Sequence, residues 1–147
     1  MSYLVDDDRD RVDTDMVWGA LREAYWGKWR SRDDVATQIR EAWRVIGAYD
    51  AQSGEQVGFA RAVSDGLGFA YLADVIVLEE HRGNGLGKRI VKAMIDDGPG
   101  AHFRWTLFTS DAHGLYEQFG FTDPGPTALV RPAGELPIHA TQAPVRD

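Results

Sequence analysis

The sequence contains no cysteine among its 147 residues. This absence excludes disulfides, thiolate metal sites and a cysteine nucleophile, and it agrees with a reducing compartment. Histidine is also scarce: the four histidines are scattered, and none forms the i, i+4 pair that sets two metal ligands on one helix face. We therefore expect no metal site.

Long apolar runs are missing as well. No window approaches the roughly eighteen unbroken apolar residues that a membrane-spanning helix requires. Residues 1–8 end in three aspartates and lack the basic and then apolar pattern of a signal peptide. These features predict no membrane partner and a cytoplasmic location.

Basic residues are outnumbered by acidic ones. Lys and Arg total 16 against 23 Asp and Glu, for a net charge of −7. This balance argues against a nucleic-acid partner, because nucleic-acid binding depends on a basic surface that matches the phosphates. An acidic surface suits a cationic substrate better, although a negative charge also serves solubility alone.

The length and the apolar content, 44%, suit one globular domain with a sizeable core. We expect this single domain over residues 1–131. Residues 132–147 are rich in Pro and Ala with little periodicity, which predicts a mobile C-terminal tail.

Hydrophobic periodicity predicts the order of the secondary-structure elements. Strands are expected at residues 3–7, 44–49, 56–63, 71–78, 103–109 and 127–130. Helices are expected at residues 15–25, 32–43, 86–97 and 111–119. This order predicts an α/β (α+β) fold whose mixed sheet contains one parallel crossover.

A glycine-rich loop follows the apolar run that ends at Leu78. Gly83, Gly85 and Gly87 stand at alternate positions, and helical periodicity begins directly after them. Glycine lets the backbone come close to a ligand, and a helix N-terminus offers unpaired N–H groups and a partial positive charge. The pattern predicts a cradle for a pyrophosphate.

Two common nucleotide motifs do not fit this loop. A P-loop requires glycine five residues before the GK pair, where this chain has Arg82, and a hydroxyl residue after Lys88, where it has Arg89. A dinucleotide fingerprint requires a third glycine where this chain has Ile90.

The remaining pattern, Arg82-x-x-Gly85-x-Gly87 preceded by Val75-x-Val77, resembles motif A of the GNAT superfamily of N-acetyltransferases. Members of that superfamily bind the pyrophosphate of acetyl-CoA in this loop. The preceding apolar strand and the following amphipathic helix agree with the resemblance and make it specific.

A second stretch, residues 115–121, resembles motif B of the same superfamily, with Tyr116 on a short helix before Gly-Phe. Segments 25–29, 58–61 and 112–116 are similar to a widespread bacterial subgroup of small GNAT proteins. The resemblance covers roughly residues 3–131. One departure is Ser110-Asp111, where many members have Asn near the start of the motif B helix.

The resemblance implies an acetyl-CoA-dependent N-acetyltransferase that acts on a primary amine of a small molecule by direct attack on the thioester. It implies a mixed, mostly antiparallel central sheet with two N-terminal helices and a β-loop-α core that binds acetyl-CoA, and it leaves a homodimer open. The implied acetyl-CoA-binding residues are Val75, Ile76, Val77, Arg82, Gly83, Asn84, Gly85, Leu86, Gly87, Lys88 and Ser110.

The same resemblance implies how the motif A strand works. The strand splays at a bulge, the Val75 N–H faces the thioester oxygen, and Val77 pairs with the pantetheine amides. Apolar side chains around such backbone groups exclude water and strengthen their dipolar contacts. Arg82 either pairs with a phosphate or fixes the loop by bonding carbonyls.

Two side chains are candidates for catalysis. Tyr116 is the predicted general acid, because its phenol can donate a proton to the departing thiolate; the alternative is a buried tyrosine packed beside Phe119 and Phe121. Asp74 lies inside an apolar strand, where a carboxylate is costly unless it is paired. It is a candidate to hold the ammonium group of the acceptor, and a structural hydrogen-bond acceptor is the alternative.

The predicted acceptor pocket is aromatic. Tyr25, Trp26 and Trp29 lie near the break between the N-terminal helices, a region that covers the amine site in GNAT proteins, and aromatic faces attract cations. Core packing is the alternative for these rings. For the whole protein, the other readings are a non-catalytic CoA-binding or interaction module and a protein N-acetyltransferase.

Overall fold

The structure is a computed structural model that describes residues 2–24 and 29–134. Its strands are β1 (Tyr3–Asp6), β2 (Arg44–Asp50), β3 (Gln56–Ser64), β4 (Phe69–Val77) and β5 (Arg104–Thr106). Its helices are α1 (Thr14–Glu23), α2 (Arg32–Glu41), α3 (Leu86–Met94) and α4 (His113–Glu117), with 3-10 turns η1 (Arg9–Arg11), η2 (Glu79–His81) and η3 (Gly125–Thr127).

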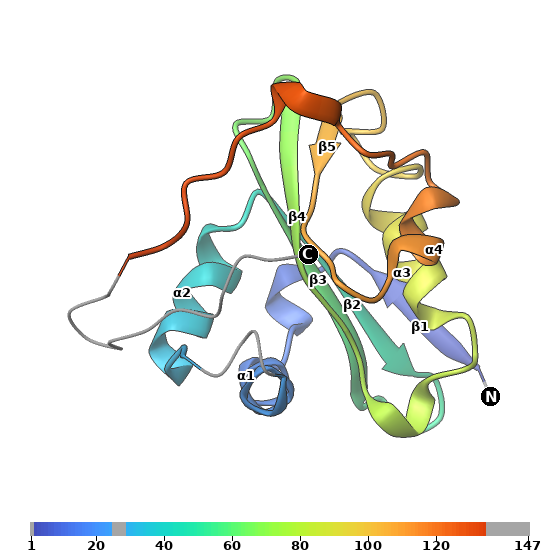
Figure 1. Cartoon of the computed structure of the whole chain (residues 1–147). Helices are drawn as coiled ribbons and strands as arrows, with labels where there is room; N and C mark the ends of the chain where they lie inside the picture. The colour runs from blue at the N-terminus through green and yellow to red at the C-terminus, as the bar shows by residue number, and fades with distance from the viewer. Residues whose placement is uncertain (1, 25–28, 135–147) are drawn as a thin grey trace.

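The strands form one five-stranded sheet in the order β1-β2-β3-β4-β5. Neighbouring strands from β1 to β4 are antiparallel, and β5 is parallel to β4. Figure 1 shows α1 and α2 on one face of the sheet and α3 and α4 on the other. The predicted mixed, mostly antiparallel sheet with two N-terminal helices is therefore confirmed.

Each face of the sheet has its own hydrophobic core. Successive residues of a strand point to opposite faces, so Val45 and Ile46 of β2 belong to different cores. The α1/α2 core is built from Val17, Leu21, Val35, Ile39, Val45, Phe59 and Ile76. The α3 core includes Ile46, Ala48, Ala60, Ala62, Leu72, Ile90, Val91 and Met94.

A β-bulge interrupts this alternation in β4. Phe59 pairs with Ile76 but Arg61 pairs with Ala73, so one residue of β3 stands opposite two of β4. Asp74, one of these two, has φ 56°, a left-handed conformation that Asp tolerates better than most residues. As a result Leu72 packs in the α3 core and Ile76 in the α1/α2 core. In a regular strand, two residues that are four positions apart would lie on the same face.

The parallel strand β5 is shorter than the predicted 103–109. Its register with β4 runs from Phe69↔Arg104 to Tyr71↔Thr106 and stops before the bulge. The strand expected at 127–130 is wrong: Gly125–Thr127 form a 3-10 turn, and Leu129 is 95% exposed. A strand needs a paired edge, and among the described residues this segment has none.

The helices also end earlier than expected. The second helix stops at Glu41 rather than residue 43, because the Trp43 N–H donates to the Ala62 carbonyl and so already belongs to the sheet. Similarly, α3 ends at Met94 rather than residue 97. Of the predicted tail over 132–147, residues 135–147 lie outside the described part of the chain.

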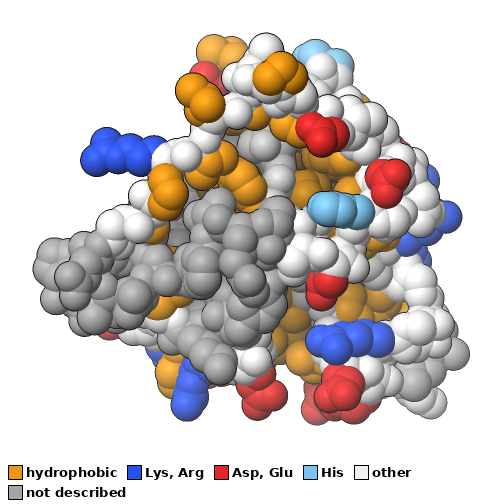
Figure 2. All heavy atoms as spheres, viewed as in Figure 1, with side chains coloured by type: hydrophobic (Ala, Val, Ile, Leu, Met, Phe, Trp, Pro, Cys, Tyr) orange, Lys and Arg blue, Asp and Glu red, His pale blue; other side chains and the backbone are white. Residues whose placement is uncertain are grey.

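The visible face of the molecule carries scattered charges. Figure 2 shows acidic and basic side chains spread singly over it, with hydrophobic side chains gathered toward its upper part. Within residues 2–24 and 29–134, no helix has the length and apolar character needed to cross a bilayer.

Candidate active site

Beyond the bulge, the edge of β4 that faces away from β3 pairs with no strand among the described residues, and we call it the open edge. The Leu78 N–H donates to the Val57 carbonyl at 2.9 Å, so at this end of the strand Ile76 and Leu78 direct their backbone groups toward β3. The alternate residues Val75 and Val77 direct theirs to the opposite edge. That edge has lost β5, whose pairing ends at Tyr71. The strand thus splays at a bulge, as the sequence resemblance implied.

The glycine loop is held in shape by its own side chains. The Arg82 Nε donates to the Val77 carbonyl at 3.0 Å, and the Asn84 Nδ2 donates to the His81 carbonyl at 3.0 Å. Gly83 and Gly85 have φ of 82° and 75°, and a Cβ at either position would meet no atom within 4 Å. Arg82 thus fixes the loop, while its exposed position leaves the rest of the guanidinium accessible.

The loop ends at an uncapped helix N-terminus. Gly85 is the N-cap of α3 and has no side chain to satisfy the first N–H groups, and the first helical bond joins the Arg89 N–H to the Gly85 carbonyl. The N–H groups of Leu86, Gly87 and Lys88 therefore have no acceptor within the helix. The exposed Lys88 adds positive charge to this end, whereas Arg89 donates to the Tyr3 carbonyl at 3.3 Å.

Helix α4 brings Tyr116 to the same side of the sheet. Leu115 lies 3.7 Å from the Cβ position of Gly87, so α4 packs on the first turn of α3. Tyr116 is 8% exposed, and its ring lies 5.8 Å from that of Phe121 at 71°. Burial, with the nearby Asp111 carboxylate, raises the pKa of Tyr116 to about 12, so the phenol stays protonated at neutral pH.

The turn before α4 is capped by Thr109. Its Oγ1 accepts the Ala112 N–H at 3.1 Å, which satisfies a backbone donor just ahead of the helix. The neighbouring Ser110, a predicted acetyl-CoA contact, lies exposed in this turn. The departure from the family pattern at Ser110-Asp111 thus falls at an accessible position.

Asp74 is the centre of a buried ion cluster. Arg30 donates to both of its carboxylate oxygens, at 2.7 and 2.8 Å, and Arg61 Nε donates to Oδ2 at 2.6 Å. The side chains of Arg30 and Asp74 are 3% and 7% exposed. Arg30 also donates to Gln38 Oε1 of α2 at 2.7 Å, which ties the cluster to the helical layer.

This cluster sets the ionisation of Asp74. Desolvation by burial alone would raise the pKa of Asp74, but the hydrogen bonds and charges of Arg30 and Arg61 outweigh it and lower the pKa. A carboxylate held in this way is a weak base, and an ammonium group would have to displace a guanidinium to bind it. The predicted catalytic role of Asp74 remains a prediction, and the geometry favours its alternative as a structural acceptor.

One of the three predicted acceptor-pocket residues lies beside this cluster. The Trp29 ring is 5.2 Å from the Arg30 Cζ, in cation–π contact. Trp29 and Asp74 are therefore joined through Arg30. Tyr25 and Trp26 lie outside the described residues.

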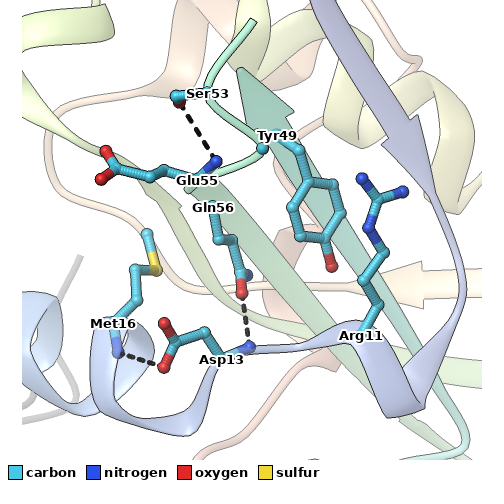
Figure 3. Close-up of a pocket in the computed structure, with 8 residues that line it drawn as sticks. Arg11, Asp13, Met16, Tyr49, Ser53, Glu55 and Gln56 are labelled. Carbon is cyan, nitrogen blue, oxygen red and sulfur yellow. Dashed lines mark hydrogen bonds between the residues drawn. The ribbon is translucent and has the colours of Figure 1, made fainter. Parts of the chain in front are cut away.

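A surface pocket lies elsewhere, between the β2–β3 turn and the start of α1 (Figure 3). Arg11, Asp13, Tyr49, Glu55 and Gln56 are among its lining residues. None of the predicted site residues belongs to it. We place the candidate active site at the splayed β4 edge instead, because that is where unpaired backbone groups, a protonated phenol and a helix N-terminus converge.

Comparison with known proteins identifies the family. Residues 41–123, more than half of the chain, match the family described as acetyltransferase (GNAT) domain. The chain belongs to the GNAT acetyltransferase family. Acetyl-CoA is the acetyl donor of that family. Among the described residues, no cluster of three or more His, Asp or Glu could hold a metal ion.

Two curated relatives resemble this GNAT protein over most of its length. A candidate acetyltransferase of Gibberella zeae is 30% identical over 113 residues, which are 74% of this chain and 62% of that protein. The mycothiol acetyltransferase of Segniliparus rotundus is 35% identical over 108 residues, 73% of this chain and 35% of that enzyme. The chain thus spans less than two thirds of the length of either relative.

Solved structures agree with the family. A candidate GNAT acetyltransferase from Xanthomonas campestris pv. campestris has a TM-score of 0.82 and 36% identity, covering 89% of this chain and 92% of that one. Glucosamine-6-phosphate N-acetyltransferase from Arabidopsis thaliana has a TM-score of 0.63 and 14% identity, covering 89% and 99%. The latter shares the fold alone.

Sequence reasoning missed the two arginines that surround Asp74. A usable signal existed for Arg61, which is the one basic residue of β3, the strand next to the apolar strand that carries Asp74. A carboxylate in such a strand requires a cationic partner. Arg30 gives no such signal, because only the fold brings residues 30 and 74 together.

Proposed function

We propose that this chain transfers the acetyl group of acetyl-CoA to the primary amine of a small molecule, by direct attack of the amine on the thioester. The observation that carries the proposal is the open edge of β4, which leads through the glycine loop into the uncapped N-terminus of α3. A pantetheine arm needs backbone groups to pair with, and a pyrophosphate needs convergent N–H groups. One continuous segment of chain offers both.

The backbone of β4 serves the acyl end of the donor. The Val75 N–H donates to the thioester oxygen, where negative charge develops as the amine attacks. Val77 offers its N–H to the pantetheine amides while its carbonyl accepts from Arg82, and Ile76 holds the strand in register against Phe59. The surrounding apolar side chains keep water away from these contacts.

The glycine loop serves the pyrophosphate. Gly83 and Gly85 leave space for its oxygens, Gly87 lets α4 pack closely on the first turn of α3, and the N–H groups of Leu86 and Lys88 point toward the pyrophosphate. Arg82, Asn84 and the Lys88 ammonium support this cradle, and Ser110 contacts the CoA tail near α4.

Tyr116 acts as the general acid. Its raised pKa keeps a proton available for the departing thiolate, and its burial beside Phe121 fixes the ring. The acceptor amine loses its proton to water, and Asp74 positions Arg30 and Arg61. Trp29, which contacts Arg30, contributes to the wall of the acceptor site.

The first experiment is thiol release from acetyl-CoA across a panel of primary amines, beside a calorimetric titration of acetyl-CoA. Turnover with one class of amine supports the proposal. Binding of acetyl-CoA without turnover would point to a binding module. Turnover on peptide or protein lysines in place of free amines would point to a protein acetyltransferase.

A further inference from the structure

The ion cluster at the bulge is not electrically balanced. It holds two guanidinium groups, Arg30 and Arg61, and one carboxylate, Asp74, for a net charge of +1. Among the described residues no second carboxylate forms an ion pair with either arginine. A buried positive charge in excess costs free energy unless an anion pairs with it. One arginine would be enough to neutralise Asp74.

Two kinds of donor in this cluster are unused among the described residues: the buried Nε of Arg30 and the more accessible Nη groups of Arg61. The Arg61 Nε is the atom that bonds Asp74, and neither Nη nitrogen has a hydrogen-bond partner among the described residues. The side chain is 13% exposed, against 3% for Arg30. A guanidinium presents its N–H groups as a fixed fork that fits a carboxylate or a phosphate. Within the described part of the chain, the Nη groups of Arg61 are therefore free, whereas both Nη groups of Arg30 bond to the protein.

The cluster lies where an acceptor would have to approach. Asp74 is covalently next to Val75, whose N–H faces the open edge of β4, and the bulge turns Asp74 and Arg61 toward the α1/α2 face. Tyr71, half-buried on β4, is close enough for Asp74, Arg61 and Arg30 to act on its pKa, which burial chiefly raises. The Tyr71 ring lies 5.9 Å from that of the exposed Phe108.

We infer that the acceptor amine carries an oxyanionic group, a carboxylate or a phosphate, and that Arg61 binds this group through its Nη donors with Arg30 behind it. The inference rests on the proposed acetyl transfer. It reverses the expectation drawn from the net charge of −7, because the local charge at the cluster is opposite in sign to that of the whole chain. Asp74 is a positioning residue in this arrangement.

The test compares amines that differ only in the anion. Lysine is compared with cadaverine for the carboxylate, and phosphoethanolamine with ethanolamine for the phosphate, by the ratio of their kcat/KM values. We expect the wild type to favour the anionic member of one pair by about tenfold or more, and the pair that responds identifies the anion. In Arg61→Gln this ratio falls by about tenfold to a hundredfold.

Two further variants complete the design. Arg40→Gln removes an exposed arginine of α2 and should leave the ratio unchanged. Arg61→Lys keeps the positive charge but lacks the forked N–H groups, so it should lose part of the preference for the anionic amines. It also serves as the less disruptive variant if Arg61→Gln folds poorly. Because the ratio is taken within one variant, it does not depend on the fraction of active protein.

The outcomes separate this inference from the proposed function. Turnover without preference for the anionic amines, or a preference that Arg61→Gln leaves intact, overturns the inference and leaves acetyl transfer standing. Bound acetyl-CoA with no turnover of any amine overturns the proposed function and the inference together.

Discussion

Arg30 and Asp74, 44 residues apart in the sequence, form a two-pronged ion pair at the point where β4 bulges. Arg30 comes from the segment before α2 and Asp74 from the sheet, so the pair connects the helical layer to the strand edge that we propose as the acetyl-transfer site. This ion pair stabilises the bulge. An aspartate with φ 56° is held by a partner on the face toward which it turns.

Removing the charge of Asp74 should destabilise the fold. Asp74→Asn leaves two buried guanidinium groups without a counter-charge, and we expect a loss of about 3–5 kcal/mol in the free energy of unfolding. Asp15→Asn breaks the exposed pair with Arg32 and should change stability little. Urea unfolding of both variants measures the difference, and equal midpoints would contradict the structural role of Asp74.

The same pair predicts a dependence of stability on acid. The pKa of Asp74 is lower in the folded protein than the unfolded value of about 3.9, so the folded protein binds its proton less readily. The resulting stability is present above about pH 4 and is lost as the pH falls through the folded pKa. The unfolding free energy of Asp74→Asn should therefore fall less steeply than that of the wild type below about pH 4; parallel curves would contradict this.

Tyr116→Phe should impair turnover and spare binding. Loss of a general acid lowers kcat by about a hundredfold to ten-thousandfold, whereas the phenyl ring keeps the contact with Phe121. Because the pKa of Tyr116 is raised to about 12, the wild-type kcat should show no decline from tyrosine ionisation below about pH 10. Steady-state kinetics and calorimetry with acetyl-CoA test both points, and an unchanged kcat would assign Tyr116 to packing.

Tyr49→Phe is the matched control for that variant. The Tyr49 hydroxyl is fully buried and has no hydrogen-bond partner in the described part of the chain; it lies on the far side of the sheet from α3, beside the pocket of Figure 3. Its removal should leave kcat unchanged and raise the unfolding free energy by about 1 kcal/mol, since an unsatisfied polar group is lost. A marked loss of stability in thermal unfolding would mean that the hydroxyl is satisfied.

Gly85→Ala should weaken acetyl-CoA binding beyond its effect on stability. Gly85 and Gly54 have φ of 75° and 77°, and a Cβ at either would meet no protein atom within 4 Å. Alanine at either position should therefore cost a similar free energy, about 1 kcal/mol. Gly85→Ala alone should lower acetyl-CoA affinity, by about tenfold, because its Cβ enters the cradle. Equal affinities in calorimetry would place the pyrophosphate elsewhere.

Local patterns predicted most of the elements. The hairpin of β2 and β3, the apolar strand β4, the glycine loop and the start of α3 all follow from alternation, turn residues and helical periodicity, which act over a few residues. Boundaries were less well predicted. The early end of β5 and the missing strand at 127–130 depend on whether a neighbouring edge is available, and a single sequence does not report that.

The sequence by itself determined the family and predicted the backbone site, because motif A is a contiguous segment whose glycines and apolar residues act through local geometry. Only the tertiary structure decided the partners of Asp74. In the sequence, Arg30 lies 44 residues and Arg61 13 residues from Asp74. The net charge where the three side chains meet therefore depends on how the segment before α2 packs against β3 and β4. Coulomb interactions act through space and not along the chain, so the composition suggested a cationic substrate, whereas the cluster of described residues at the bulge carries a net positive charge.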